Sequence, residues 1–386
     1  MRRKVLICLL SSSVGLGVQA FATTLTVNCD KGQSVNAGLA KLSKTGPHTV
    51  TVSGTCTEDI AIRGFDDLQL LASPGTVLNK APGSAPAVID VVASSRIVID
   101  GFTIEGPTLA PGVPATPTGI QFTGSVASSV SHATITGGGS GIIVDGSQAR
   151  ITDSTISESW AFWATVIVFD ASIIELANVT LEAGHPYSTG LAVGLLGSAV
   201  VESGSFRDFG AGISVQGGGL VNPSNTGPVV FENNRVGLLI GPAAAAELQG
   251  DVQFIDNGDG SDFSGGIVVD GGALHLPNYS SLPGTVIRNS NGQGLVLMNN
   301  ASARIGSVTI EGSGLNGIVV LNSSTLQFEP PIPFPPFGTS SVTGSAAKDV
   351  FCDSHSVVTG GAYITGATKI TCKNLVSGPS VPLPQP

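Results

Sequence analysis

A four-residue phrase, glycine followed by apolar, any and apolar residues, recurs along this chain and constrains its fold more than any other feature. Successive copies begin 22, 49, 22, 25, 29, 28 and 23 residues apart. The interval of 49 holds a degenerate copy, Ile167-Val168-Phe169, which lacks the glycine. A short unit repeated at this period is typical of a solenoid, in which each repeat packs on its neighbours. The complete copies begin at Gly119, Gly141, Gly190, Gly212, Gly237, Gly266, Gly294 and Gly317.

Each repeat holds two further short strand patterns. A tight polar turn and a second alternating segment follow the phrase, as in residues 148–151, 273–276 and 302–305. A third apolar segment comes next, as in residues 133–135, 178–181 and 307–310. Three strands of about four residues, with their turns, fill a repeat of about 22 residues. The sequence therefore predicts an all-β, three-faced parallel solenoid.

Composition agrees with this fold and excludes one class of partner. Charged residues make up 11% of the chain and glycine contributes 52 of 386 residues, which favours strands and turns over helices. The formal charge of -10 argues against nucleic acid, whose binding proteins need a basic surface. It also disfavours the binding of a long polyanion without a metal ion.

The two ends of the chain differ from the repeats. Arg2, Arg3 and Lys4 precede an apolar stretch at residues 5–18, and Ala20-Phe21-Ala22 fits a cleavage site. Residues 1–22 therefore read as an export signal, and we expect a secreted protein, extracellular or periplasmic, without a transmembrane segment after cleavage. An uncleaved N-terminal anchor is the alternative. Residues 376–386 form a Pro-rich tail.

Between these ends we expect a cap followed by the coils. Residues 23–62 form the N-terminal cap and first coil, with a short helix capped by Ser34 in which Val35, Leu39 and Leu42 have helical spacing. Residues 63–375 form the parallel β-helix, with Pro-rich insertions at 107–118 and 329–338. A cap is needed because the last coil of a solenoid otherwise exposes its core and an unpaired strand edge.

Four cysteines remain in the mature chain, a pair near each end. Disulfides persist in the compartments that exported proteins reach. Because opposite ends of a rod never meet, we expect Cys29 to pair with Cys56 and Cys352 with Cys372. Free thiols or metal ligation are the alternative.

These features together resemble the pectin-lyase-like superfamily of right-handed parallel β-helix proteins. The resemblance rests on Gly-Thr-Cys-Thr-Glu-Asp-Ile at residues 54–60, on the Gly-Ile-x-Val coils and on third strands such as Val308-Thr309-Ile310. It covers roughly residues 24–375 and implies a right-handed β-helix. It does not define an activity, since this scaffold carries lyases, hydrolases, esterases, epimerases, adhesins and tailspikes.

In enzymes of this superfamily the resemblance implies a groove along one parallel sheet, with charged residues at outward positions. We assign the third position of the phrase as outward, and none of its members is charged. This apolar stripe disfavours catalysis on that sheet and leaves two explanations open: a polysaccharide or protein partner, or cover by the chain's own loops. The stripe comprises Gln121, Ile143, Val168, Ala192, Ser214, Leu239, Val268, Val296 and Val319.

Three other groups are candidate sites, each with a structural alternative. Asp90 and Asp100 are candidate catalytic acids on neighbouring strand segments, or carboxylates that bond turn amides. Asp256, Asp259 and Asp262 are candidate calcium ligands, or residues of a solvated loop. No other cofactor is expected.

The third group is aromatic. Trp160 and Trp163, with Glu158 before them and Tyr187 one coil later, are candidate glycan-binding residues, because exposed rings stack on sugars and a carboxylate bonds hydroxyls. Alternatively, the tryptophans fill a bulge in the core. We carry two functional hypotheses: a non-catalytic surface or extracellular solenoid that binds glycans or another partner, and a polysaccharide-active enzyme with an unrecognised site.

Overall fold

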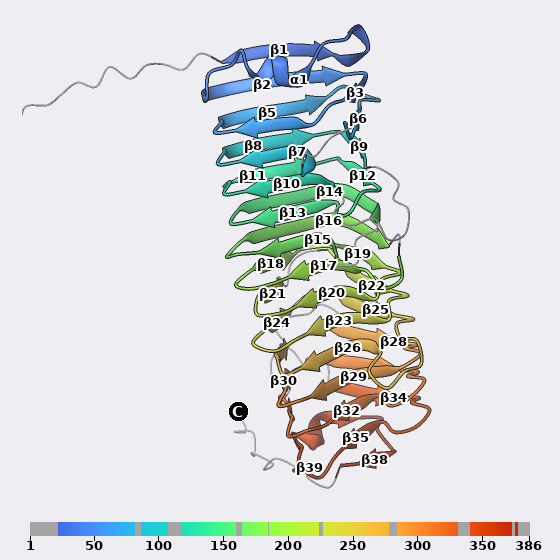
Figure 1. The fold of residues 1–386 in the computed structure, drawn as a ribbon. Coiled ribbons are helices and arrows are strands. Elements are labelled where there is room, and N and C mark those ends of the chain that lie inside the picture. Colours follow the sequence, from blue (N-terminus) through green and yellow to red (C-terminus); the bar gives the residue numbers. More distant parts are fainter. Residues whose placement is uncertain are drawn as a thin grey trace, which may run out of the picture.

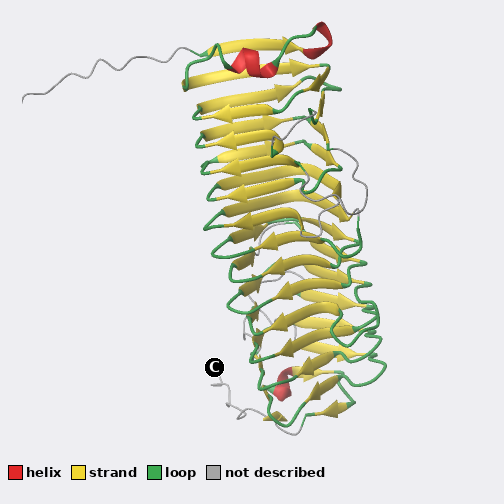
Figure 2. Ribbon diagram, in the orientation of Figure 1, coloured by secondary structure: helices red, strands yellow, loops and turns green. Residues whose placement is uncertain are grey.

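The chain forms a single stack of β coils (Figure 1). The structure is a computed structural model and describes residues 22–81, 86–106, 117–159, 164–183, 185–223, 227–277, 284–330, 340–372 and 375–376. Strands dominate, and helix is confined to short pieces near the two ends (Figure 2). The predicted all-β parallel solenoid is confirmed.

The first face of the solenoid is a parallel sheet of 13 strands that contains the glycine phrases. Its strands are β4 (Ile60–Arg63), β7 (Ala87–Val92), β10 (Thr118–Thr123), β13 (Ile142–Asp145), β15 (Ala164–Phe169), β17 (Thr189–Val193), β20 (Ala211–Val215), β23 (Val236–Ile240), β26 (Gly265–Asp270), β29 (Gln293–Met298), β32 (Ile318–Val320), β35 (Val350–Cys352) and β38 (Ile370–Thr371).

The second face carries the alternating segments that follow each phrase. Its strands are β1 (Thr23–Asn28), β2 (Thr45–Ser53), β5 (Asp66–Ala72), β8 (Ser95–Asp100), β11 (Ser128–Ser131), the first part of β14 (Gln148–Ser159) and of β16 (Ile173–Ala183), β18 (Ser198–Val201), β21 (Gly219–Asn222), β24 (Ala245–Leu248), β27 (Ala273–Leu276), β30 (Ser302–Ile305), β33 (Thr325–Phe328), β36 (Val357–Thr359) and β39 (Leu375–Val376).

The third face completes each coil. β14 and β16 run around the corner from the second face, and they connect the two faces into one hydrogen-bonded sheet. The other strands of the third face are β3 (Thr55–Thr57), β6 (Val77–Asn79), β9 (Thr103–Glu105), β12 (Thr134–Thr136), β19 (Gly204–Arg207), β22 (Val229–Glu232), β25 (Val252–Ile255), β28 (Thr285–Arg288), β31 (Val308–Glu311), β34 (Ser340–Thr343) and β37 (Ile364–Thr365).

Inward side chains form ladders along the axis. Register pairing stacks Ile142, Val166, Leu191, Ile213, Leu238, Ile267, Leu295 and Ile318 in one row of the first face. All of them are fully buried. Within this row, the second position of the glycine phrase therefore faces the core, as at Ile142, Ile213, Ile267, Leu295 and Ile318.

The repeated glycine is required by space. A Cβ at Gly237 would lie 2.5 Å from the Phe254 ring and 2.6 Å from the carbonyl oxygen of Gly266. Gly141 faces Ile156 in the same way, at 2.2 Å. The glycine thus lets each first-face strand approach the inward residue of the third face in its own coil. The phrase repeats because the coils that carry it share this close approach.

The degenerate coil corrects our assignment by one residue. Val166 pairs with Ile142 and Ile167 pairs with Ile143, so Thr165 takes the place of the glycine. Ile167 is therefore the outward residue, and Val168, which we assigned to the outward stripe, is buried in the core. Without the glycine, a run of apolar residues gives no signal that fixes its register.

Both predicted disulfides, Cys29–Cys56 and Cys352–Cys372, are present in the structure. The predicted helix is α1 (Val35–Leu39), and the Ser34 side chain accepts a hydrogen bond from the Ala37 amide. Glu58 accepts further bonds from the Val35 and Asn36 amides. The first coil is thus tied to the cap by a covalent bond and by capping bonds.

Several expectations fall outside the described residues. These include the export signal apart from its last residue, the tail beyond residue 376, and most of the insertions at 107–118 and 329–338. Within the part of the chain that the structure describes, no helix is long and apolar enough to cross a membrane.

Candidate functional site

The apolar outward stripe of the first face is largely buried in its C-terminal half. Val268, Val296 and Val319 are 1%, 0% and 5% exposed, and they form a second apolar cluster with Leu239 and Phe351. The structure contains this chain alone, so the cover comes from the protein itself. These three outward residues are thus closed to solvent, which favours the self-cover alternative there.

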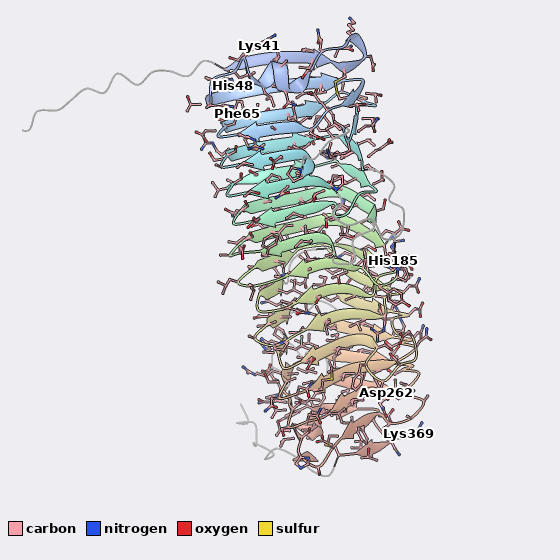
Figure 3. The ribbon with its side chains drawn as sticks, viewed as in Figure 1. Lys41, His48, Phe65, His185, Asp262 and Lys369 are labelled. Atoms are coloured by element: carbon pink, nitrogen blue, oxygen red, sulfur yellow. A yellow bond between two sulfur atoms is a disulfide. The ribbon has the colours of Figure 1, made fainter. Side chains whose placement is uncertain are left out.

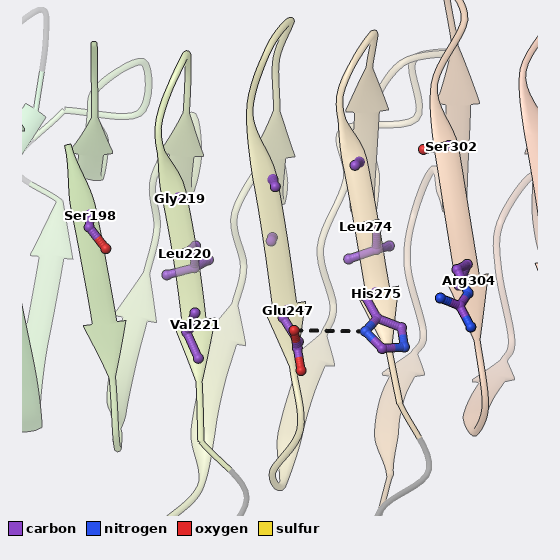
Figure 4. Close-up of a pocket in the computed structure, with 12 residues that line it drawn as sticks. Ser198, Gly219, Leu220, Val221, Glu247, Leu274, His275, Ser302 and Arg304 are labelled. Carbon is purple, nitrogen blue, oxygen red and sulfur yellow. Dashed lines mark ion pairs between the residues drawn. The ribbon is translucent and has the colours of Figure 1, made fainter. Parts of the chain in front are cut away.

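An open hollow lies instead on the second face. Its volume is about 350 Å³, and it is lined by residues of β18, β21, β24, β27 and β30 (Figure 4). We call it the second-face groove. Its outward lining is Ser198, Gly219, Val221, Ala245, Glu247, Ala273, His275, Ser302 and Arg304.

The floor of the second-face groove is a row of small residues. Pairing places them directly side by side on adjacent strands, at the first outward position of each strand. None of them extends beyond a Cβ or a hydroxyl, so the surface is hollowed relative to the neighbouring rows. The row is Ser198, Gly219, Ala245, Ala273 and Ser302.

Ionisable residues occupy the next outward position and form one wall. Glu247, His275 and Arg304 are in register on β24, β27 and β30. Nδ1 of His275 lies 3.8 Å from a Glu247 carboxylate oxygen, and Nε2 lies 3.9 Å from Glu329. Arg304 forms an ion pair of 2.5 Å with Glu329. The wall therefore presents an imidazole between two carboxylates, with a guanidinium beside them.

Glu247 is held from a second side. The Gln249 side-chain amide donates to Glu247 at 2.5 Å, and these residues lie two apart on the same outward surface. The His275 side chain is 26% exposed and that of Glu247 is 36% exposed. These groups are therefore oriented by neighbours and still reachable from solvent.

A second charged cluster lies on the same face closer to the N-terminus. Arg150 binds Glu175 at 2.6 Å and Glu202 at 2.8 Å. The hydrogen bonds from Glu202 and then Glu175 raise the pKa of the Arg150 side chain. Both carboxylates contact the same guanidinium, so this cluster links three coils.

Asp90 and Asp100 are not brought together. Asp90 lies on β7 of the first face and forms an ion pair of 2.8 Å with Arg63. Asp100 ends β8 in the other sheet, where it accepts hydrogen bonds from Ser131 and His132, both at 2.7 Å. The bond from His132 lowers the pKa of Asp100. Consecutive strands occupy different faces of a coil, so the pairing expected from neighbouring segments does not form.

The three candidate calcium ligands do not converge either. Asp259 accepts bonds from the Ser261 hydroxyl and amide at 2.6 and 3.0 Å, and from Arg235 at 2.8 Å. The bonds from Ser261 hold the pKa of Asp259 well below its usual value. Among the described residues, the group of three candidate ligands whose atoms lie within 4.8 Å is Cys29, Cys56 and Glu58, and its cysteines are disulfide-bonded. Asp256 and Asp262 have no part in it.

The aromatic candidates are only partly described. Trp160, Trp163 and the Glu158 side chain lie outside the described residues. Tyr187 is 74% exposed, and its ring centroid lies 5.4 Å from that of His185. Figure 3 shows His185 at the edge of the stack. Both residues precede β17, at the corner between the third and first faces. Tyr187 therefore belongs to a different part of the surface from the second-face groove.

The sequence prediction did not include the groove, because it concerned only the outward row of the first face. The second-strand segments Ala246-Glu247-Leu248, Leu274-His275-Leu276 and Ala303-Arg304-Ile305 each place a charged or titratable residue between two inward ones. Alternation alone would have assigned all three as outward.

Comparison with known proteins supports the fold. No family model and no curated protein matches the chain. A mutant of DFA-IIIase from Arthrobacter chlorophenolicus in complex with DFA-III is 11% identical, with a TM-score of 0.50, over 92% of this chain and 99% of that one. The catalytic unit of a GH87 alpha-1,3-glucanase from Streptomyces thermodiastaticus is 12% identical, with a TM-score of 0.48, over 89% and 69%. PfbA, a surface adhesin of Streptococcus pneumoniae, is 10% identical, with a TM-score of 0.43, over 92% and 96%.

Identities this low establish the fold alone. The chain shares the parallel β-helix fold of the DFA-IIIase, and the sequence resemblance implied such a fold. Its activity has to be argued from its own residues.

Proposed function

We propose that this chain is an exported, non-catalytic β-helix protein that binds glycans in the second-face groove. One observation carries the proposal: a small-residue floor lies beside a wall of His275, Glu247 and Arg304. Saccharide hydroxyls both donate and accept hydrogen bonds, and this wall offers carboxylate acceptors and guanidinium donors within one short row. The floor leaves room for a sugar ring to approach the sheet. Export is supported by the two disulfides, which persist in oxidising compartments.

The test is an array of immobilised polysaccharides probed with the mature protein and its variants. We expect Glu247→Ala and His275→Ala to reduce binding at least tenfold. Arg207→Ala is the control, because Arg207 is an exposed arginine on the third face. The proposal fails if no glycan binds, or if binding persists unchanged in both groove variants.

A double variant, Trp160→Ala with Trp163→Ala, tests the aromatic candidates in the same assay. Loss of binding in this variant, with the groove variants unaffected, would move the site to the tryptophans.

Glu329 and Glu247 on opposite sides of His275 favour one second candidate, a polysaccharide-active enzyme. Two carboxylates beside a bound sugar are the usual groups for glycoside hydrolysis. An assay for reducing sugars and unsaturated products on each bound glycan separates the two candidates. Turnover abolished by Glu329→Gln, Asp90→Asn or Asp100→Asn, with the fold intact, would establish catalysis.

We expect no activity on polygalacturonate, with or without calcium.

A further inference from the structure

We infer that the ligand of the second-face groove is a linear, uncharged oligosaccharide of limited length that lies along the solenoid axis. This inference rests on the proposed function and specifies the direction in which the ligand lies, its length and its charge. The direction and the length follow from the sizes of the side chains along the floor, and the charge follows from the ion pairs of the wall.

The direction follows from the strand register. The five floor residues occupy equivalent positions on five successive strands, so the row crosses the strands and runs along the stacking axis. Adjacent strands are about 4.8 Å apart, and four intervals make a channel of about 19 Å. A ligand that contacts the whole floor must therefore be extended along that axis.

Larger side chains close both ends of the row. Ile173 occupies the same register position one coil before Ser198, and its side chain is 41% exposed. Beyond Ser302 the row continues with Thr325 and then Val357, which is 36% exposed. The hollow is thus a bounded channel. Bounded ends limit the number of sugar units that contact the floor.

The wall disfavours an anionic ligand. Arg304 is paired with Glu329, and His275 lies between Glu329 and Glu247. The two carboxylates outnumber the guanidinium at this wall, and the whole chain carries a formal charge of -10. A polyanion would be repelled at this surface, whereas neutral hydroxyls bond to carboxylates without a charge penalty.

A peptide that binds by adding a strand does not suit this surface. β-augmentation requires an unpaired sheet edge. Each of the strands β18, β21, β24, β27 and β30 is paired on both sides within the second face. The floor therefore offers side chains rather than free backbone groups.

The test is calorimetric titration of the mature protein with length series of cello-, xylo- and maltooligosaccharides, with oligogalacturonates as the anionic series. In the series that binds, we expect affinity to rise with length until the extended ligand reaches about 19 Å and then to stay constant. Ile173→Ala removes one end wall and should move the plateau to a longer oligomer. Val126→Ala, which truncates an exposed valine outside the groove lining, should leave it unchanged.

A blocking variant separates this inference from the proposed function. Ala245→Phe fills the floor at an exposed position and should weaken binding at least tenfold while the circular dichroism spectrum stays the same. If no oligosaccharide binds, or if Ala245→Phe binds normally, both the inference and the proposed function fail. If Ala245→Phe blocks binding but affinity rises without a plateau, or the anionic series binds most tightly, the groove is the site and only the inference is overturned.

Discussion

At the scale of single residues, we infer that packing requires the glycine of the repeated phrase. Comparing a substitution there with one at a glycine that has open space around it tests this inference. Gly237→Ala would place its Cβ against Phe254 and the Gly266 carbonyl, whereas a Cβ at Gly219 meets no described atom within 4 Å. We expect Gly237→Ala to lower the free energy of unfolding by about 1–3 kcal/mol, and Gly219→Ala to change it little. Urea denaturation measures both. Equal effects would show that conformational freedom, rather than space, selects the glycine.

Also at the residue scale, Asp259 predicts a pH dependence of stability. Its pKa is lowered in the folded protein by the bonds from Ser261, with Arg235 contributing. In the unfolded chain Asp titrates near 3.9, so the stabilisation is present above about pH 4 and is lost as the pH falls below it. Asp259→Asn should therefore lower the melting temperature at pH 7. Because the side chain is 47% exposed, the effect should stay under about 1 kcal/mol. A difference that persists undiminished at pH 2 would contradict this account.

At the scale of elements, the disulfides stabilise the terminal coils rather than the whole rod. Cys352–Cys372 closes a loop with a sequence separation of 20. Replacing both cysteines by serine should cost about 3 kcal/mol locally. Hydrogen exchange should speed up in β35, β36 and β38, and amides of β13 should keep their protection, because each coil contacts only its neighbours. Uniform loss of protection along the chain would contradict this picture.

The elements also show what the sequence could predict. The glycine phrase located the first-face strands, because the same steric requirement recurs in the coils that carry it. The degenerate coil was misread by one residue, because Val166, Ile167 and Val168 are all apolar and only the missing glycine would have set the register. The position of the groove could not be predicted, because it depends on which outward row stays open to solvent. Sequence alternation places Glu247 and His275 on the outside, but it does not reveal that the outward residues Val268 and Val296 are covered.

At the scale of the whole molecule, we propose that the second face binds the glycan and that the first face is mainly structural. Chemical footprinting with diethyl pyrocarbonate tests this claim most directly, because His275 lies in the groove wall and His132 lies outside the groove lining, 66% exposed. We expect a saturating glycan, chosen from the array, to slow the modification of His275 at least severalfold and to leave His132 unchanged. Equal modification of His275 with and without the bound glycan would contradict the account and place the binding site elsewhere.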